Sequence, residues 1–431
     1  MLKSANEIFE YIRQQVRKGN YKPNDSLPPI RDLAEMLGVN RNTVSSAYQK
    51  LVVAGIATTR GRNGTVINQV TGDADREGFV SDMALIDVAG GNPGPEFLPD
   101  PILLARSIDS TPKLYGEASV SSGLRKIGKK WLDDGVPEEH ELSVTHGAVD
   151  AVERLLRAYL IAGDRVVVEE PCFLSSISTI KTNGYKAVGV PVDEEGMNTA
   201  LLSKALSRGA QAVIITPRAQ NPTGWALSKE RAGEIRDLLA KYPQVLIVVD
   251  DHFSLLSSSD YHSIIPADAR HWALVRTVSK FFGPDLRVAL MASDPETALR
   301  LQQRLSPGIG WVSHILQDMV QGGLSSPEVM EKIEYAKNEY WRRREKFTAE
   351  LKRHGINISD KHGGLNVWIP LKNGSEQIVT EAMKKGWLLR SAEGFNVNKS
   401  AQGLRITISA LSDGQIESLA EIVATLVKKF G

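Results

Sequence analysis

The amino-acid sequence predicts an α/β protein with a small N-terminal helical domain and a large domain built on a mainly parallel sheet. Its 431 residues are many for one domain, since most domains have roughly 100 to 200. Residues 1–68 hold 10 Lys and Arg against 5 Asp and Glu, and this surplus of five positive charges leaves −4 for the rest of a chain whose formal net charge is +1. From residue 85 onward, short aliphatic runs alternate with helical stretches, which is typical of a parallel sheet covered by helices.

Composition is that of a globular protein with a sizeable core, because 42% of the residues are hydrophobic and 24% are charged. The single cysteine, Cys172, excludes an intramolecular disulfide and a CxxC metal site, so we expect a reducing compartment and no metal. The N-terminal MLKSANEIFEYIRQQVRKG interleaves charged and apolar residues, unlike a signal peptide or a membrane span. We therefore expect a cytoplasmic protein that does not enter the membrane.

Three helices are predicted in the basic N-terminal part. The first ends at Gly19, the second begins after the proline pair at 28–29 and ends at Gly38, and the third runs from about Arg41 to Ala54. The third helix has a polar outer face, as a DNA recognition helix requires. The apolar stripes that define the three helices are Ile8, Ile12 and Val16; Ile30, Leu33, Ala34 and Leu37; and Val44, Ala47, Tyr48 and Leu51.

A hairpin with a basic tip is expected directly after the third helix. The stretch IATTRGRNGTVI contains two short strands around a Gly/Asn turn that carries Arg60 and Arg62. Such a wing is suited to the phosphates or the minor groove of DNA.

The segment SLPPIRDLAEMLGVNRNTVSSAYQKLVVAGI, followed by TTRGRNGTVI, resembles the winged helix-turn-helix of GntR-type repressors. The resemblance implies that residues 1–68 bind double-stranded DNA at a promoter or operator, and that Arg31, Arg41, Thr43 and Arg62 reach it. Arg forks onto guanine or phosphate whereas Lys acts as a point charge, so Lys should not substitute freely at the arginine positions.

Residues 69–84, QVTGDADREGFVSDMA, are predicted to be a linker because they lack hydrophobic periodicity and are mainly polar and acidic. A flexible chain of this length spans roughly 20 Å. We therefore expect the DNA-binding domain to stay close to the large domain, residues 85–431.

Polar residues follow four of the predicted strands of the large domain. The runs RVVVEEP, AVIITP, VLIVVDD and ALVRTVSK end at Glu170-Pro171, Thr216-Pro217, Asp250-Asp251 and Ser279-Lys280, and a further strand is expected in RVALMAS. Open α/β sheets bind ligands outside the carboxyl ends of their strands, so these residues should share one crevice.

The residues expected in this crevice suit pyridoxal 5'-phosphate. Lys280 supplies an amine for a Schiff base with the aldehyde, Asp250 can hold the proton of the ring nitrogen, and Phe173 can stack on the ring. The phosphate requires backbone N–H groups at a helix start, hydroxyls and a guanidinium. The candidates for it are Gly147, Ala148 and Val149 in THGAV, with Thr277, Ser279 and Arg287.

The large domain resembles fold type I aminotransferases, which depend on pyridoxal phosphate. The resemblance rests on AGGNPGP, YGEASVSSGLRKIGKKW, VTHGAVDAV, TPRAQNPTG, VVDDHF, TVSKFFGPDLRVALMAS and LRITIS. It implies that Asn221 bonds the phenolic oxygen of the cofactor and that Arg405 forks onto a substrate carboxylate. Tyr115 matches the tyrosine that a partner subunit sends to the phosphate, which implies a homodimer.

A GntR-type head on an aminotransferase-like body is the arrangement of the MocR regulators, which the whole chain resembles. Members control transcription in response to pyridoxal phosphate or to amines that react with it, and they form head-to-tail dimers. The resemblance implies sensing at Lys280 and control of vitamin B6 salvage genes. His252 departs from the pattern, since many members have tyrosine there; we expect it at the cofactor, with altered proton handling.

Two functions of different class remain open from the sequence. One is a transcriptional regulator that uses pyridoxal phosphate as its effector. The alternative is a functional aminotransferase with an autoregulatory head, because Asn221 and the NPTG turn resemble genuine enzymes, so a residual half-reaction is compatible with the sequence. The arginines retained in the head favour the regulator. A DNA-binding module on an inert scaffold would require all the cofactor residues to be coincidental.

Overall fold

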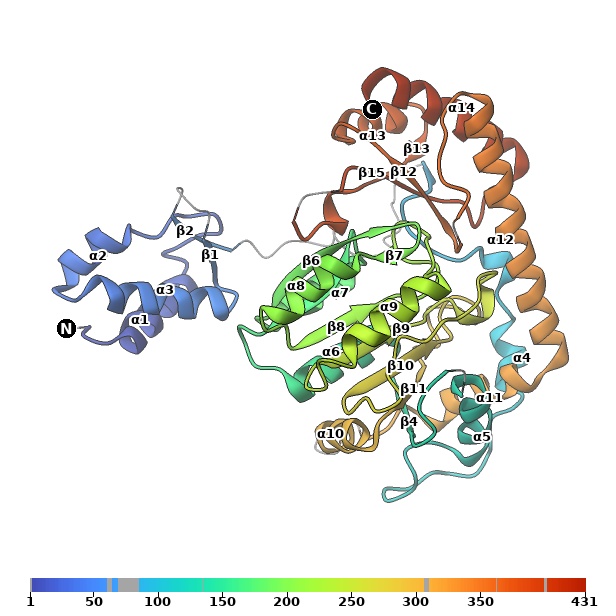
Figure 1. Cartoon of the computed structure of the whole chain (residues 1–431), viewed down its shortest axis with the longest axis horizontal. Coiled ribbons are helices and arrows are strands. Elements are labelled where there is room, and N and C mark those ends of the chain that lie inside the picture. The colour runs from blue at the N-terminus through green and yellow to red at the C-terminus, as the bar shows by residue number, and fades with distance from the viewer. Residues whose placement is uncertain are drawn as a thin grey trace. The chain divides into compact units, whose positions relative to one another are not determined.

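The chain adopts the predicted α/β fold class in two parts, a winged helix-turn-helix and a larger domain on a mixed, mostly parallel sheet (Figure 1). It forms two compact units. The first contains residues 2–68 together with 160–164 and 178–186, and the second contains the rest of residues 85–431. We call residues 2–68 the head and residues 85–431 the body; the predicted linker, residues 69–84, lies outside the described part. This computed structural model describes residues 2–59, 64–68, 85–133, 135–305, 310–361, 363–398 and 401–431.

Three helices and an antiparallel hairpin make up the head. Ser4 begins the first helix with a reciprocal capping box, and Gly38 ends the second in the left-handed conformation, with φ of 64°. The three predicted apolar stripes face one core, in which Ile8, Val44 and Leu51 are fully buried. The elements are α1 (Ala5–Arg17), α2 (Ile30–Leu37), α3 (Arg41–Val53), β1 (Ala57–Thr59) and β2 (Thr65–Ile67).

The chain just before the proline pair is hydrogen-bonded to the hairpin. Three backbone bonds join the two: Asn24 N to Ile67 O, Ile67 N to Asp25 O, and Leu27 N to Thr65 O, at 2.9, 2.9 and 2.8 Å. Tyr48 of α3 also donates through its hydroxyl to Pro28 O at 2.7 Å, and burial raises the pKa of this phenol. The start of α2, the recognition helix and the base of the hairpin are thus tied together.

The body contains an eight-stranded sheet in the order β4-β11-β10-β9-β8-β5-β6-β7. The pairs β5–β8, β8–β9 and β9–β10 are parallel, and their apolar runs are buried as predicted. The strands are β4 (Glu141–Thr145), β5 (Arg165–Glu170), β6 (Lys186–Asp193), β7 (Gly196–Met197), β8 (Ala212–Ile215), β9 (Leu246–Asp250), β10 (Trp272–Thr277) and β11 (Ala289–Ser293).

One edge of the sheet is antiparallel, because β11 runs against both β10 and β4. We expected RVALMAS simply as one more strand of a largely parallel sheet. Residues 278–288 connect β10 to β11 without a helix, and a parallel return would need a longer crossover. This edge places β4 and β11 beside the end of β10.

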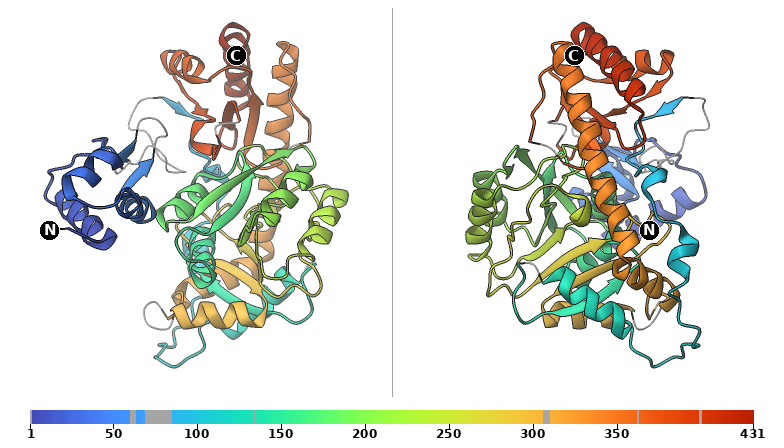
Figure 2. Two further views of the ribbon diagram at one scale, coloured as in Figure 1. Left: turned by 60° about the vertical axis from the view of Figure 1, so that its left-hand side comes forward. Right: turned by 90° about the vertical axis from the view of Figure 1, so that its right-hand side faces the viewer.

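Helices cover the sheet and also build the C-terminal part of the body (Figures 1 and 2). The longest, α12 (Pro327–Arg353), runs from the large core to this C-terminal part, where it packs on α14. The other helices are α4 (Pro101–Ala105), α5 (Ser122–Leu132), α6 (Ala148–Tyr159), α7 (Leu174–Thr182), α8 (Thr199–Ser207), α9 (Lys229–Leu239), α10 (Pro295–Leu305), α11 (His314–Ser325), α13 (Glu376–Lys384) and α14 (Asp413–Phe430), with short 3-10 turns η3 (Pro95–Phe97), η4 (Ser254–Leu256) and η5 (Glu393–Phe395).

Two small sheets complete the C-terminal part of the body. In one, β15 lies between β12 and β14; in the other, β13 pairs in parallel with β3, the first strand after the linker. Their strands are β3 (Ile86–Asp87), β12 (Asn366–Pro370), β13 (Trp387–Leu388), β14 (Arg390–Ser391) and β15 (Gly403–Thr407). Among the described residues, no helix has the length and apolar character to cross a membrane.

Candidate functional site

Three of the predicted site residues line one pocket at the carboxyl ends of the parallel strands. Asn221, His252 and Lys280 follow β8, β9 and β10, which are adjacent in the sheet. The pocket is open to solvent. Its remaining lining residues are Ala219, Gln220, Gly224, Phe253, Gly363, Gly364, Leu365 and Asn366.

The amine of Lys280 is half-buried and donates to a backbone carbonyl. Its Nζ lies 2.8 Å from Gly91 O, in the AGGNPGP stretch. An amine held at a pocket wall by a backbone acceptor is available to a carbonyl compound that enters the pocket.

Asp250 presents a buried oxygen without a hydrogen bond. Its Oδ1 has no hydrogen-bond donor within the described part of the chain and lies 3.7 Å from His252 Nδ1, too far for a hydrogen bond. Buried carboxylate oxygens are normally bonded, so this one has the character of an acceptor kept for a ligand.

The predicted phosphate cradle lies where β4, β10 and β11 meet. Thr145, Ala289 and Thr277 stand in register across the three strands. Gly147 follows with φ of +92°, and a Cβ there would lie 2.9 Å from the Arg287 guanidinium, so glycine lets Arg287 approach the start of α6. Side chains at 148 and 149 offer no donor, which leaves their backbone N–H groups at the helix N-terminus.

The two predicted hydroxyls lie beside this cradle. Thr277 Oγ1 donates to Val288 O at 3.1 Å and lies 3.3 Å from Ser279 Oγ. Both residues stand between the end of β10 and Lys280, so the cradle and the amine belong to one continuous region.

Arg405 and Asn221 meet inside the body. Arg405 on β15 is fully buried, and its Nη1 donates to Asn221 Oδ1 at 3.1 Å. Its Nη2 donates to Ala89 O. The side chain predicted to bind a carboxylate therefore already touches the side chain predicted to bind the cofactor.

Two further predicted residues, Phe173 and Tyr115, also do not line the pocket. Phe173 lies half-buried just before α7. Tyr115 is 95% exposed and contacts the Trp311 ring edge-on, with the ring centroids 5.6 Å apart. Within one chain Tyr115 is thus turned to solvent.

Sequence reasoning chose Glu170 at the end of β5, but Glu169 is the carboxyl group close to Asp250. Glu170 accepts from Val397 N and Asn398 N at 2.9 and 3.0 Å, because neighbouring strand residues point to opposite faces. Glu169 accepts from Thr216 N at 3.3 Å, and burial raises its pKa to about 8, with the nearby Asp250 charge acting in the same direction. Strand alternation places the two glutamates on opposite faces, but the continuous buried run before them gives no sign of which face holds the site.

Gln220 was also missed. Its Nε2 donates to Pro171 O at 2.7 Å and lies 3.3 Å from Glu169 Oε2, which links the NPTG turn to the end of β5. Its position immediately before Asn221 was the available clue.

An ion-pair network lies directly behind the site. Asp251 is fully buried and accepts from Arg218 Nε at 2.9 Å and from Arg276 Nε at 2.7 Å. Both guanidinium groups lie over the Tyr261 ring, 5.4 and 5.1 Å from its centroid. We call Asp251, Arg218, Arg276 and Tyr261 the ion-pair network; it fixes the ends of β8, β9 and β10 relative to one another.

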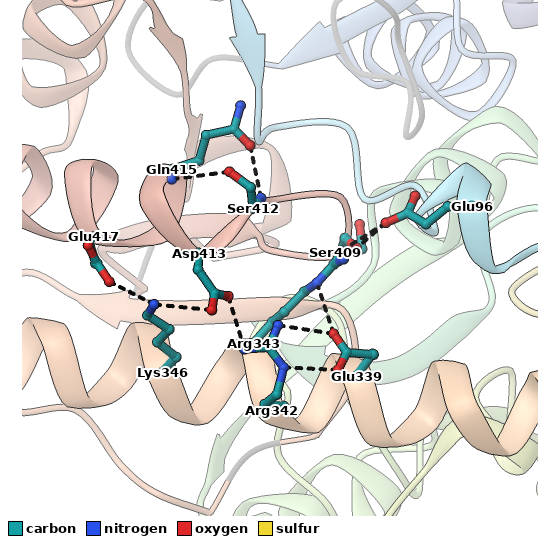
Figure 3. Close-up of polar contacts among 10 residues, drawn as sticks. All are labelled: Glu96, Glu339, Arg342, Arg343, Lys346, Ser409, Ser412, Asp413, Gln415 and Glu417. Carbon is teal, nitrogen blue, oxygen red and sulfur yellow. Dashed lines mark hydrogen bonds and ion pairs between the residues drawn. The ribbon is translucent and has the colours of Figure 1, made fainter.

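A second charged cluster surrounds α12 (Figure 3). Arg343 pairs with Glu96 at 3.1 Å, lies over the Phe97 ring and donates to Ser409 O. Arg342 pairs with Glu339 and Asp413, each at 2.9 Å. These contacts attach the chain around η3 and the start of α14 to one helix.

In the head, the predicted DNA-facing residues lie on the helix-turn-helix. Arg31 in the first turn of α2 and Arg41 at the first position of α3 are exposed, and Thr43 is half-exposed on α3. Asn40 caps α3 by accepting from Asn42 N at 2.9 Å. Arg62 lies outside the described residues.

The side chains of the body site fit pyridoxal phosphate. The unbonded Asp250 oxygen suits a protonated ring nitrogen, the Gly147–Arg287 approach suits a phosphate, and Lys280 suits an aldehyde. The cofactor would supply an electron-withdrawing ring. The protein side chains would hold that ring in position beside Lys280.

Two family models match the chain. Residues 99–423 match aminotransferase class I and II, and residues 4–67 match bacterial regulatory proteins of the gntR family. Among solved structures, the multiple substrate aminotransferase of Thermococcus profundus superposes with a TM-score of 0.73 at 22% identity, over 81% of this chain and 93% of that one. This likeness shows the fold.

Curated relatives span both parts of the chain. The vitamin B6 salvage pathway transcriptional repressor PtsJ of Salmonella typhimurium is 47% identical over 418 residues, 97% of each chain. The probable rhizopine catabolism regulatory protein MocR of Rhizobium meliloti is 24% identical over 96% of this chain and 90% of its own. The pyridoxine biosynthesis regulator PdxR of Corynebacterium glutamicum is 28% identical over 58% of this chain and 56% of its own.

Proposed function

This chain belongs to the MocR-type regulators, a gntR-family head joined to an aminotransferase class I and II body, and on that premise we propose that it regulates transcription in response to pyridoxal 5'-phosphate. The head binds operator DNA, and the body binds the effector at Lys280. The observation that carries the proposal is the 47% identity to a vitamin B6 salvage repressor over 97% of both chains, since it includes head and body together. Control of vitamin B6 salvage genes follows as the proposed role.

In the body, each residue has a defined task. Asp250 holds the ring proton, Asn221 and His252 border the ring, and Arg287 with the start of α6 holds the phosphate. Thr277 and Ser279 add hydroxyls, Phe173 contributes a stacking face and Arg405 receives a carboxylate. Burial raises the pKa of Glu169 to about 8, so Glu169 is mainly protonated at neutral pH.

In the head, Arg31 and Arg41 bind DNA, with Thr43 and Arg62 completing the contact. We further propose a cytoplasmic, head-to-tail homodimer in which Tyr115 reaches the partner's phosphate site. Its 95% exposure supports this, because a tyrosine within a monomer is seldom so fully presented to solvent.

The DNA-binding half of the proposal is tested by fluorescence anisotropy with DNA from upstream of the protein's own gene and its neighbours. Arg41→Ala should weaken binding at least about tenfold and reduce the salt slope by about one. Arg17→Ala is the matched control, since Arg17 is an exposed arginine at the end of α1, outside the helix-turn-helix. If both variants lose the same DNA affinity, the loss comes from net charge alone, and a specific contact of Arg41 with DNA is contradicted.

The sensing half is tested by repeating the titration with pyridoxal phosphate. Pyridoxal phosphate should change either the affinity of the wild-type protein for DNA or the protein–DNA complex that forms. Lys280→Gln, which cannot condense with an aldehyde, should bind DNA normally without effector and show no change with it. A response that survives in Lys280→Gln would contradict covalent sensing.

A second candidate function is transamination, favoured by the contact between Arg405 and Asn221, the two residues expected at substrate and cofactor. Many turnovers per site with common amino donors would support an enzyme. A single half-reaction that then stops would leave only the regulator.

A further inference from the structure

The two main donors of the proposed effector site both bond to one short piece of backbone. Lys280 Nζ donates to Gly91 O at 2.8 Å, and Arg405 Nη2 donates to Ala89 O. Lys280 follows β10 in the large sheet, whereas Arg405 lies on β15 in the C-terminal part of the body. We call residues 88–94 the strap, because both donors converge on it from different elements.

Side-chain hydroxyl groups hydrogen-bond to the strap at three further positions. Gly91 N donates to Thr407 Oγ1 at 3.0 Å, Ser409 Oγ donates to Asn92 O at 2.5 Å, and Gly94 N donates to Tyr340 Oη at 3.1 Å. Its residues 88–91 are buried. Water therefore does not readily replace a lost partner.

The strap lies close to the start of the body in sequence. The described part of the body begins at residue 85, the two residues of β3 pair with β13, and the strap begins at the residue after β3. The covalent path from the head to the effector site thus enters the body through the strap.

We infer that the strap senses occupation of the effector site and passes it to the covalent connection with the head. This inference rests on the proposed function. When Lys280 reacts, its nitrogen forms a double bond to the aldehyde carbon, and the aldehyde oxygen leaves as water with two hydrogens of the amine. The nitrogen then no longer holds Gly91 O as an ammonium does.

A buried carbonyl that loses its donor must find another or move. The Gly90-Gly91 pair permits that movement, because Gly91 already has φ of +66° and neither residue has a Cβ to hinder a turn of the peptide plane. The contact from Lys280 to Gly91 O exists only while the effector site is empty. The effector therefore interacts differently with the two states of the strap, which is what a shift in their populations requires.

The first experiment measures hydrogen exchange of the peptides covering residues 85–98 in the full-length protein, with and without pyridoxal phosphate. Exchange is measured on the unreduced protein, and formation of the Lys280 adduct is verified by mass in a separate sample reduced with borohydride, because reduction returns the nitrogen to an amine. We expect amide exchange in the strap to change about tenfold, the equivalent of one charge-assisted bond. An adduct with unchanged strap exchange overturns the inference and leaves the proposed function standing, whereas failure to form the adduct overturns both.

Three variants separate the loss of the bond from the loss of the chemistry. Lys280→Ala removes the donor to Gly91 O and should raise strap exchange about tenfold even without effector. Lys280→Gln keeps a donor there and should leave strap exchange as in the wild type. Lys332→Ala is the matched control, since Lys332 Nζ donates to Leu98 O at 2.6 Å in the same stretch of chain but outside the site; its effector response should persist. Identical exchange in all three variants contradicts the inference.

The second experiment inserts four Gly and Ser residues between Ala84 and Leu85. Effector binding and the strap response should remain, while the effector-induced change in DNA affinity falls to no change. If the inserted protein still alters its DNA affinity as the wild type does, the strap is not the relay.

Discussion

Asp250 and Asp251 are neighbours in sequence, but their carboxylates lie in two regions with different hydrogen-bond partners. Asp251 lies in the ion-pair network, where two arginines occupy its oxygens and a ring covers them. Asp250 belongs to the site, where its Oδ1 has no hydrogen bond among the described residues and where Lys280 is held by a backbone carbonyl. The comparison shows two kinds of carboxylate surroundings. The oxygens of Asp251 are bonded to arginines of the protein, whereas Asp250 and Lys280 in the site can take a ligand as their partner.

The strongest test of this contrast is Asp251→Ala, which removes the carboxylate that two buried arginines share. We expect the free energy of unfolding to fall by about 3 to 5 kcal/mol, as when one partner of a buried pair is removed. Urea unfolding measures it. The control is Asp193→Ala, whose pair with Arg231 is at the surface and should cost less than about 1 kcal/mol. Equal costs would show that the network is not the scaffold we describe.

The next largest effect concerns pH at Glu169. Because burial raises its pKa to about 8 from 4.5, the native state binds more protons than the unfolded state between these values. Stability should therefore be greatest below about pH 4.5 as far as this group is concerned, and should decline as pH rises to about 8 by up to about 1.4 kcal/mol per pH unit. Glu169→Gln should remove that decline in unfolding curves recorded across this range. An unchanged pH profile would mean that Glu169 is ionised in the folded protein.

A smaller effect on the free energy of unfolding is expected in the charged cluster of Figure 3, which is less buried than the ion-pair network. Arg343 is mostly buried and bonds a backbone carbonyl, so Arg343→Ala should cost about 1 to 2 kcal/mol. Arg342 is 45% exposed, so Arg342→Ala should cost less than about 1 kcal/mol, and this loss should shrink in high salt. Unfolding at two salt concentrations distinguishes them; a reversed order would contradict the assigned burial.

The smallest stability effect should come from the site itself. Asp250→Asn should change the free energy of unfolding by less than about 1 kcal/mol, since its Oδ1 has no hydrogen bond to lose. The same variant should weaken pyridoxal phosphate binding at least about tenfold, because the ring proton loses its ionic partner. Titration by visible absorbance measures this. A large loss of stability with normal affinity would place Asp250 in the scaffold.

The sequence predicted the fold class and the residues of the site that lie at strand ends. Lys280 was found because an apolar run indicates a strand, and the residues after such strands share one edge of the sheet. Asn221 and His252 came from the resemblance to aminotransferases and MocR regulators. The apolar stripes of the head likewise predicted its core. The roles of the individual site residues stay predictions.

What escaped prediction has physical reasons. A backbone carbonyl has no sequence signature, so the bonds from Lys280 to Gly91 and from Arg405 to Ala89 could not be foreseen. The pairing of Asp251 with Arg218 and Arg276 joins positions far apart in sequence. The choice of Glu170 over Glu169 depended on which face of β5 each residue occupies, and a continuous buried run does not reveal that.

The backbone bonds between the segment before the proline pair and β2 have a mechanical consequence for the head. They join the base of the wing to the start of α2, and Tyr48 joins α3 to the same proline pair. Three contact surfaces that could each meet a duplex are therefore parts of one stiff body. Such a body cannot adjust one surface independently, so a site with altered groove width must deform the DNA to be bound. Discrimination among operators would then draw on the stiffness of the DNA sequence as well as on its bases.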